Sequence, residues 1–214
     1  MPDLNIQNDL SGLKNAPPPG DGVRISPGFS DPVAHSRMVF RAVLRAFAEP
    51  GLIVPAPFRS FFSQPVEPVV LTALALTFCD SKTTVNFSGS LAGLYPYLAF
   101  HAGSAQESPE RADFVFCGSP DELPPLKELS MGTELRPDLS ALVAARLKGG
   151  GGGRFQATGP GIKENRIIED VGLPSSFVKE REALAVLLPQ GLDFIFALEE
   201  AVLALPRTTR LREL

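Results

Sequence analysis

Cysteine, histidine and tryptophan are scarce in this sequence, which has two, two and none of them among its 214 residues. Cys79 and Cys117 each end an apolar run and form no C-x-x-C pair, so we expect free, buried thiols in a reducing compartment rather than a disulfide. The histidines, His35 and His101, lack a second ligand at metal-binding spacing, and an ordinary zinc site therefore has no ligand set. We expect no metal.

Basic charge and long apolar runs are also lacking. The formal net charge is -4, whereas nucleic-acid-binding surfaces carry an excess of lysine and arginine. The longest mostly apolar segment, residues 69–79, is too short to span a bilayer. The N-terminus has neither the basic nor the apolar part of a secretory signal. These absences argue against a nucleic-acid binder and a membrane protein, and they predict a cytoplasmic location.

Two parts of the chain differ in composition. Residues 1–27 contain Pro17-Pro18-Pro19 and few apolar side chains, so they bury too little to offset the entropy cost of ordering and predict a flexible tail. The remainder, residues 28–214, is long enough to bury a sizeable core as a single α/β domain.

Common catalytic motifs are incomplete or missing. The five glycines Gly149–Gly153 are followed by Arg154-Phe155 rather than by the lysine and hydroxyl of a phosphate loop, so they predict a flexible hairpin connection. The turn Gly159-Pro160-Gly161 begins like a dinucleotide fingerprint, but Glu164 occupies the last glycine position. No G-x-S-x-G nucleophile motif occurs. The sequence therefore names no catalytic residue and no cofactor.

The first helix is predicted just after the tail. Asp31 is a good N-cap, Pro32 suits the first helical position, and Glu49-Pro50-Gly51 ends the helix. Apolar residues recur between these ends at helical spacing, at Val33, Phe40, Val43, Leu44 and Phe47. Arginines lie four residues apart on the flank of that stripe, at Arg37, Arg41 and Arg45. They suit either a solvated face or a contact with an acidic partner or anion.

Strands and helices alternate along the rest of the chain, which predicts an α/β domain with a mixed sheet flanked by helices. The expected strands are residues 52–55, 84–87, 98–100, 113–116 and 154–158, and the expected helices are residues 65–77, 88–97 and 174–187. Residues 139–147 suit either a strand or a helix.

The last thirty residues carry the densest signal. Apolar runs on either side of Glu199-Glu200 suit two buried strands, although the same residues also fit one helix face, and Glu-Glu is a poor two-residue turn. Pro206 ends the second run, so Arg207-Thr208-Thr209 should be exposed. A guanidinium beside two hydroxyls suits a carboxylate, phosphate or phosphonate.

Two further side chains bear on that cluster. Asp193 lies between apolar neighbours and is costly to bury unless it is paired, and Arg207 is the natural partner if the two strands are adjacent. A structural Asp193–Arg207 pair and an anion site at Arg207 both remain open. His101 is predicted at the end of a strand, before a Gly-Ser loop, where a general base is plausible, but a lone histidine is more often structural.

Several motifs in one order resemble a known family. They are Gly28-Phe29-Ser30-Asp31-Pro32-Val33, Phe100-His101, Thr158-Gly159-Pro160-Gly161-Ile162, Gly172-Leu173-Pro174 and the closing Pro206-Arg207-Thr208-Thr209. This series resembles the PhnH subunits of the carbon-phosphorus lyase system, and the resemblance runs from about residue 27 to residue 211.

The resemblance implies a core-complex subunit that is non-catalytic alone. With sister subunits of the PhnG, PhnI and PhnJ types it would help an alkylphosphonate displace adenine from MgATP, giving a ribose 1-phosphonate 5-triphosphate. It also implies a homodimer, a fold like that of pyridoxal phosphate-dependent transferases without the cofactor lysine, and no cofactor. Arg41 matches a position that is typically arginine in the family and becomes a partner-contact candidate.

Other possibilities stay open. A phosphonate or nucleotide could be bound by this subunit. The alternative from another class is a free-standing transferase that holds an anionic substrate through Arg207, Thr208, Thr209 and His101.

Overall fold

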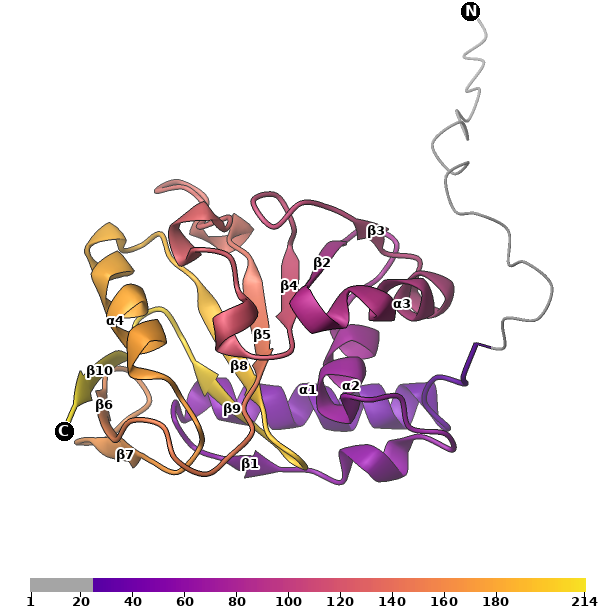
Figure 1. Ribbon diagram of the computed structural model, residues 1–214, viewed down its shortest axis with the longest axis horizontal. Coiled ribbons are helices and arrows are strands. Elements are labelled where there is room, and N and C mark those ends of the chain that lie inside the picture. Colours follow the sequence, from indigo (N-terminus) through magenta and orange to yellow (C-terminus); the bar gives the residue numbers. More distant parts are fainter. Residues whose placement is uncertain (1–24) are drawn as a thin grey trace, which may run out of the picture.

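The computed structural model describes residues 25–214, which form two sheets and the helices around them (Figure 1). The large sheet contains β1 (Val54–Pro55), β2 (Thr84–Ser88), β3 (Ala105–Gln106), β4 (Phe114–Cys117), β5 (Leu142–Arg146), β8 (Asp193–Ala197) and β9 (Ala201–Leu205). The small sheet contains β6 (Phe155–Thr158), β7 (Arg166–Ile168) and β10 (Arg210–Glu213).

Helices account for most of the remaining secondary structure. The α-helices are α1 (Pro32–Ala48), α2 (Val69–Phe78), α3 (Tyr95–Ala102) and α4 (Ser175–Ala183). Shorter 3-10 helices are η2 (Phe58–Phe61), η3 (Gly89–Leu94), η4 (Pro120–Glu122), η5 (Leu126–Glu128), η6 (Pro137–Leu139) and η7 (Leu184–Leu187). None of the helices in the described part of the chain is long and apolar enough to cross a bilayer.

The large sheet is mixed and mostly parallel, which confirms the predicted α/β class. Its order is β1-β9-β8-β5-β4-β2-β3. The pairs from β3 to β8 are parallel, whereas β9 is antiparallel to both β8 and β1. The chain leaves β2 toward β3 on one side and leaves β4 toward β5 on the other. The carboxyl ends of β2 and β4 therefore form a topological switch point, where open α/β sheets commonly bind ligands.

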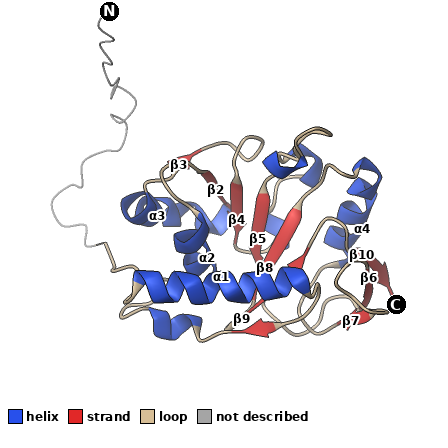
Figure 2. Ribbon diagram, turned by 180° about the vertical axis from the view of Figure 1, so that it is seen from behind, coloured by secondary structure: helices blue, strands red, loops and turns tan. Residues whose placement is uncertain are grey.

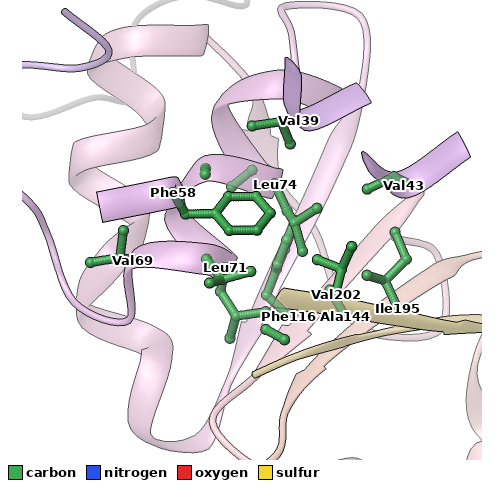
Figure 3. Packing of buried hydrophobic residues seen from close by; sticks show 14 of the residues in the cluster. Val39, Val43, Phe58, Val69, Leu71, Leu74, Phe116, Ala144, Ile195 and Val202 are labelled. Carbon is green, nitrogen blue, oxygen red and sulfur yellow. The ribbon is translucent and has the colours of Figure 1, made fainter. Parts of the chain in front are cut away.

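Helices cover both faces of this sheet. Successive residues of a strand point to opposite faces, so each strand contributes side chains to two cores. On β8, Ile195 and Ala197 pack with α1 and α2, as Figure 3 shows for Ile195 beside Val43. Phe194 and Phe196 pack on the opposite face with α4 and the small sheet. Figure 2 shows α1 lying across one face of the strands, with α4 and the small sheet at one end.

The first helix begins as predicted, but its buried face differs. The Asp31 carboxylate accepts a hydrogen bond from the Ala34 N–H at 3.0 Å, which confirms the N-cap. The predicted stripe is wrong at three of its residues, because Val33, Phe40 and Leu44 are 81%, 50% and 57% exposed. The residues against the sheet are Val39, Ala42, Val43 and Ala46, whose small side chains let the helix lie close to β9.

Two expected elements have other forms. Residues 98–100 belong to α3 rather than to a strand, because Pro96 suits the first turn of that helix and Gly103, in the left-handed region, caps its end. The second helix begins at Val69 rather than at residue 65, after Pro68.

The glycine run is not a hairpin, because β5 and β6 belong to different sheets. The residues Gly149–Gly152 all have positive φ, a conformation that glycine adopts without strain. The N–H groups of Gly150 and Gly153 donate to the carbonyls of Asp170 and Leu173, so the run lies against that segment. The predicted turn Gly159-Pro160-Gly161 is present, since the Ile162 N–H donates to the Gly159 carbonyl.

The predicted tail, residues 1–27, mostly falls on residues 1–24, which lie outside the described residues. Its last residues are held by α3: the Tyr97 hydroxyl donates to the Pro27 carbonyl at 3.0 Å. Both cysteines are buried free thiols, as predicted. Burial raises the pKa of the Cys79 thiol to about 12, which makes it a poor nucleophile.

Candidate functional site

The C-terminal hairpin consists of two buried strands. β8 and β9 pair antiparallel, with Phe194 opposite Leu205 and Ala197 opposite Val202. Glu199-Glu200 forms the two-residue turn after all, closed by a hydrogen bond from the Leu198 N–H to the Ala201 carbonyl at 2.9 Å. This register brings Asp193, the first residue of β8, close to Arg207, which follows β9 by two residues.

Arg207 and Asp193 form a pair with extensive hydrogen bonding. The Asp193 carboxylate accepts from Nε of Arg207 at 3.1 Å and from Nη2 at 2.5 Å, and it also accepts from the Arg207 backbone N–H at 2.7 Å. Nη2 donates to Ser140 Oγ at 2.6 Å, and Nη1 donates to the carbonyls of Pro137 and Pro189 at 2.9 and 3.2 Å.

Every N–H group of the Arg207 guanidinium therefore has an acceptor within the chain. The structural pair that the sequence left open is present in the structure. It ties the start of β8 to the end of β9, and it holds the loops that precede β5 and β8. An anion at Arg207, which stays a prediction, would have to displace one of these acceptors.

The two threonines after Arg207 have different surroundings. Thr208 is exposed, whereas Thr209 is fully buried, and its N–H donates to the Pro206 carbonyl at 2.9 Å. The expectation that the whole segment is exposed is wrong for Thr209. After β9 ends at Leu205, the chain turns and continues into β10, which pairs with β6. Thr209 directly precedes β10 and is buried there.

Arg181 is the residue that the sequence interpretation missed. It lies on α4 and is only 6% exposed. Nη1 donates to the Thr209 carbonyl at 2.9 Å and to Glu182 at 2.7 Å, and Nη2 donates to the Pro206 carbonyl at 2.6 Å. Nε is buried and has no acceptor among residues 25–214. A signal was present, because Phe177, Val178 and Arg181 share one helix face.

A small cavity of about 20 Å³ lies beside the two arginines. Its walls come from α4, η7, β8 and the segment that joins them, and they comprise Arg181, Leu184, Ala185, Leu188, Gln190, Gly191, Leu192, Phe194 and Arg207. The volume has room for about one water-sized group. Burial also lowers the pKa of the Arg181 guanidinium, although that group stays charged at neutral pH.

His101 lies far from Arg207 in the fold. It sits near the end of α3, where Nε2 is 2.9 Å from the Ser26 carbonyl and the ring packs 4.5 Å from the ring of Tyr97. Its contacts are therefore with α3 and the segment that precedes α1, so the structure does not join His101 to the Arg207 cluster. In residues 25–214 no three acidic, cysteine or histidine side chains gather where they could hold a metal ion.

A second polar site lies at the switch point. Glu122 on η4 reaches the start of η3, directly after β2, where its carboxylate accepts from the N–H and the hydroxyl of Ser90, both at 2.8 Å. These bonds, with a further one from the Gly118 N–H, lower the pKa of Glu122. A Cβ atom at Gly118 would lie 2.1 Å from Ser90 Oγ and 2.9 Å from Glu122 Oε1, so a larger residue there would displace these side chains. A side chain thus occupies the place where a bound anion would lie.

Arg41 is exposed on α1, beside Arg37 and Arg45 on the outer face of that helix. Arg45 pairs with Glu49, but no ion pair of Arg41 occurs within the described residues. The structure is therefore compatible with both interpretations of Arg41.

Comparison with known proteins agrees with the sequence resemblance. A sequence model described as PhnH, bacterial phosphonate metabolism protein, matches residues 27–212. The chain is 33% identical over 192 residues to the Alpha-D-ribose 1-methylphosphonate 5-triphosphate synthase subunit PhnH of Rhizobium meliloti, covering 87% of this chain and 94% of that protein. It is 28% identical over 173 residues to HtxG of Stutzerimonas stutzeri, provisionally described as a C-P lyase subunit, covering 80% and 83%. This chain belongs to the PhnH family.

Proposed function

We propose that this chain is the PhnH-type subunit of a carbon-phosphorus lyase assembly in the cytoplasm. The single observation that carries the proposal is the family match along residues 27–212. The Rhizobium meliloti relative is named as a subunit of a synthase of alpha-D-ribose 1-methylphosphonate 5-triphosphate. In that assembly, partners of the PhnG, PhnI and PhnJ types would act with this chain while an alkylphosphonate displaces adenine from MgATP.

The chain alone is non-catalytic under this proposal. Support comes from the arrangement of its polar side chains. Arg207 donates its hydrogen bonds to Asp193 and to loop carbonyls, and Nε2 of His101 lies 2.9 Å from the carbonyl of Ser26. Arg207 and His101 do not line a common cavity in the described part of the chain, so the geometry supports a scaffold more than a reaction centre.

The outer face of α1 is where we place a subunit contact, either with a second copy of the chain or with a sister subunit. Val33, Phe40 and Leu44 are large apolar side chains exposed on that face, at a spacing of seven and four residues. Arg41 lies beside them. Exposed apolar patches of this kind commonly mark protein interfaces, and arginine is enriched in them.

Co-expression tests both statements. The chain carrying an affinity tag is produced with PhnG-, PhnI- and PhnJ-type proteins, and the masses of the captured complexes are measured. We expect a stable complex with the wild-type chain and at least fivefold lower recovery with Arg41→Glu. Lys179→Glu, an exposed change on α4, is the control and should leave recovery unchanged. Unchanged recovery with Arg41→Glu would return Arg41 to a solvated face.

The fold resemblance to pyridoxal phosphate-dependent transferases without the cofactor lysine is kept as a proposal, together with its implication that the chain works without a cofactor. A visible absorption scan of the purified chain tests the absence of the cofactor. A pyridoxal chromophore would contradict a subunit that works without a cofactor and would favour the free-standing transferase.

A further inference from the structure

The outer face of α1 carries a stripe of large side chains that the described part of the chain leaves uncovered. Val33, Phe40 and Leu44 are 81%, 50% and 57% exposed. Arg37 lies on the same line, so the four residues follow the spacing i, i+4, i+7 and i+11 over about 16 Å, or about three turns. Figure 2 shows α1 in front of the sheet, with no other described element across it. This spacing is typical of a helix that packs against another helix.

Phe40 is both exposed and supported from below. Its ring centroid lies 6.1 Å from that of Phe78 at the end of α2, which lies 6.4 Å from that of Phe114 on β4. Because Phe40 already packs against Phe78 on one side, its ordering on binding costs less entropy than the ordering of a free side chain. Aromatic anchors contribute much of the binding energy at protein interfaces. Phe40 therefore suits the centre of an interface.

Positive charge runs along the same face. Arg37, Arg41 and Arg45 are exposed, and the only ion pair among them in residues 25–214 joins Arg45 to Glu49 at 3.3 Å. Glu49 also lies 3.8 Å from Arg166, so one carboxylate serves two guanidiniums. The middle of the face is thus basic, on a chain whose net charge is -4. A partner that presents carboxylates beside an apolar row complements this face.

The order of these charges argues against a second copy of this chain as the partner. A twofold axis brings a face against the same face of the other subunit. If α1 lay antiparallel on its copy, Arg41 would meet Arg41 near the middle. The carboxylates of Asp31 and Glu49, which lie at the two ends of α1, would meet each other. Like charges placed together across an interface oppose association, so a different polypeptide fits better.

We propose that the outer face of α1 docks an acidic amphipathic helix of a sister subunit, and not a second copy of this chain. The partner helix lays apolar residues along Val33, Phe40 and Leu44, and its carboxylates face Arg37 and Arg41. A length of about three turns matches the exposed stripe. The assignment of that helix to a sister subunit rests on the proposed function, whereas its acidic and apolar character rests on the surface of α1.

Photo-crosslinking within the co-expressed assembly identifies the occupant. Phe40 is replaced by p-benzoylphenylalanine, which keeps an aromatic ring, and the complex captured with PhnG-, PhnI- and PhnJ-type proteins is irradiated. Lys179, exposed on α4 across the sheet, receives the same replacement as the control. We expect position 40 to crosslink to a sister subunit, in a segment with more Asp and Glu than Lys and Arg, and position 179 to give at least tenfold less of that product. A crosslink to a second copy of this chain, or none in an assembly that does form, overturns the proposal.

A pair of double variants tests the role of charge. Arg37→Glu with Arg41→Glu reverses two charges at exposed positions, whereas Arg37→Lys with Arg41→Lys keeps them and is the matched control. We expect at least tenfold lower complex recovery with the glutamate variant, and recovery within threefold of the wild type with the lysine variant. Equal recovery of the two variants overturns the acidic partner. If the wild-type chain captures no sister subunit, the proposed function fails and this proposal with it, whereas a complex that forms without the crosslink removes the docking surface alone.

Discussion

Groups that attract anions lie at both ends of the parallel strands of the large sheet, which we call its carboxyl edge and its amino edge. The two edges differ in whether these groups already have hydrogen-bond partners within the chain. At the carboxyl edge, the donors of Ser90 and Gly118 converge on Glu122, an acid from the same chain. At the amino edge, Arg207 is also satisfied internally, whereas Arg181 keeps one donor without an acceptor in residues 25–214. Ligand sites are therefore better sought where donors remain unused than where donors are merely abundant.

This comparison reverses the usual expectation for an α/β sheet. Ligands in open sheets of this type bind beyond the carboxyl ends of the strands, at the switch point. Here a carboxylate of the chain fills that place, and the unused donor lies beside the start of β8. The non-catalytic role proposed above predicts such a difference.

The largest effect is expected at the satisfied arginine. Arg207→Ala removes the side-chain donors to Asp193 and to the carbonyls of Pro137 and Pro189 and leaves Asp193 only the backbone N–H, so we expect it to lower the free energy of unfolding by about 3 kcal/mol. Urea denaturation measures the change. Arg212→Ala, at an exposed position on β10, is the control and should cost less than about 0.5 kcal/mol. Wild-type stability with loss of oxyanion binding would instead make Arg207 itself the anion site.

A smaller effect is expected at Glu122. Glu122→Ala removes a partly exposed acceptor of two hydrogen bonds from Ser90, and we expect a loss of about 1 kcal/mol at pH 7. Because the vacated donors then resemble an anion site, added phosphate should stabilise the variant more than the wild type. An equal response of the two proteins to phosphate would contradict the view that Glu122 takes the place of an anion.

The pH dependence of this loss follows from the lowered pKa of Glu122. Its ordinary value is 4.5, and the folded value lies below it. The carboxylate therefore stabilises the fold fully above about pH 4.5, and that contribution disappears as the pH falls through the lowered pKa. The difference in unfolding free energy between wild type and Glu122→Ala should shrink on acidification below pH 4.5. A difference that stays constant would show that charge is not its source.

Local signals in the sequence predicted the elements that depend on few residues. Asp31-Pro32 set the start of α1, and the apolar runs around Glu199-Glu200 predicted two buried strands as one of two forms. The exposed side of α1 was not predictable, because Val33, Phe40 and Leu44 follow the same periodicity as a buried stripe. Only the packing of small alanines against β9 decides which apolar side faces the sheet.

The candidate site was predicted in part. The sequence indicated that Asp193 and Arg207 could pair, since burial of an aspartate demands a partner. It gave no weight to Arg181, because an arginine on a helix usually lies in solvent. The burial of Arg181 depends on β10, because the residue before that strand, Thr209, accepts a hydrogen bond from Arg181. The four residues of β10 are too few to show a periodicity that would predict the strand.

Growth on methylphosphonate of the organism that encodes this chain tests the central claim most directly. The gene for this chain is deleted, and growth is measured with methylphosphonate or with phosphate as the only phosphorus source. A PhnH-type subunit predicts loss of growth on methylphosphonate, restored by a plasmid copy, with growth on phosphate unchanged. Normal growth of the deletion strain on methylphosphonate would contradict the assignment of this chain to a carbon-phosphorus lyase assembly.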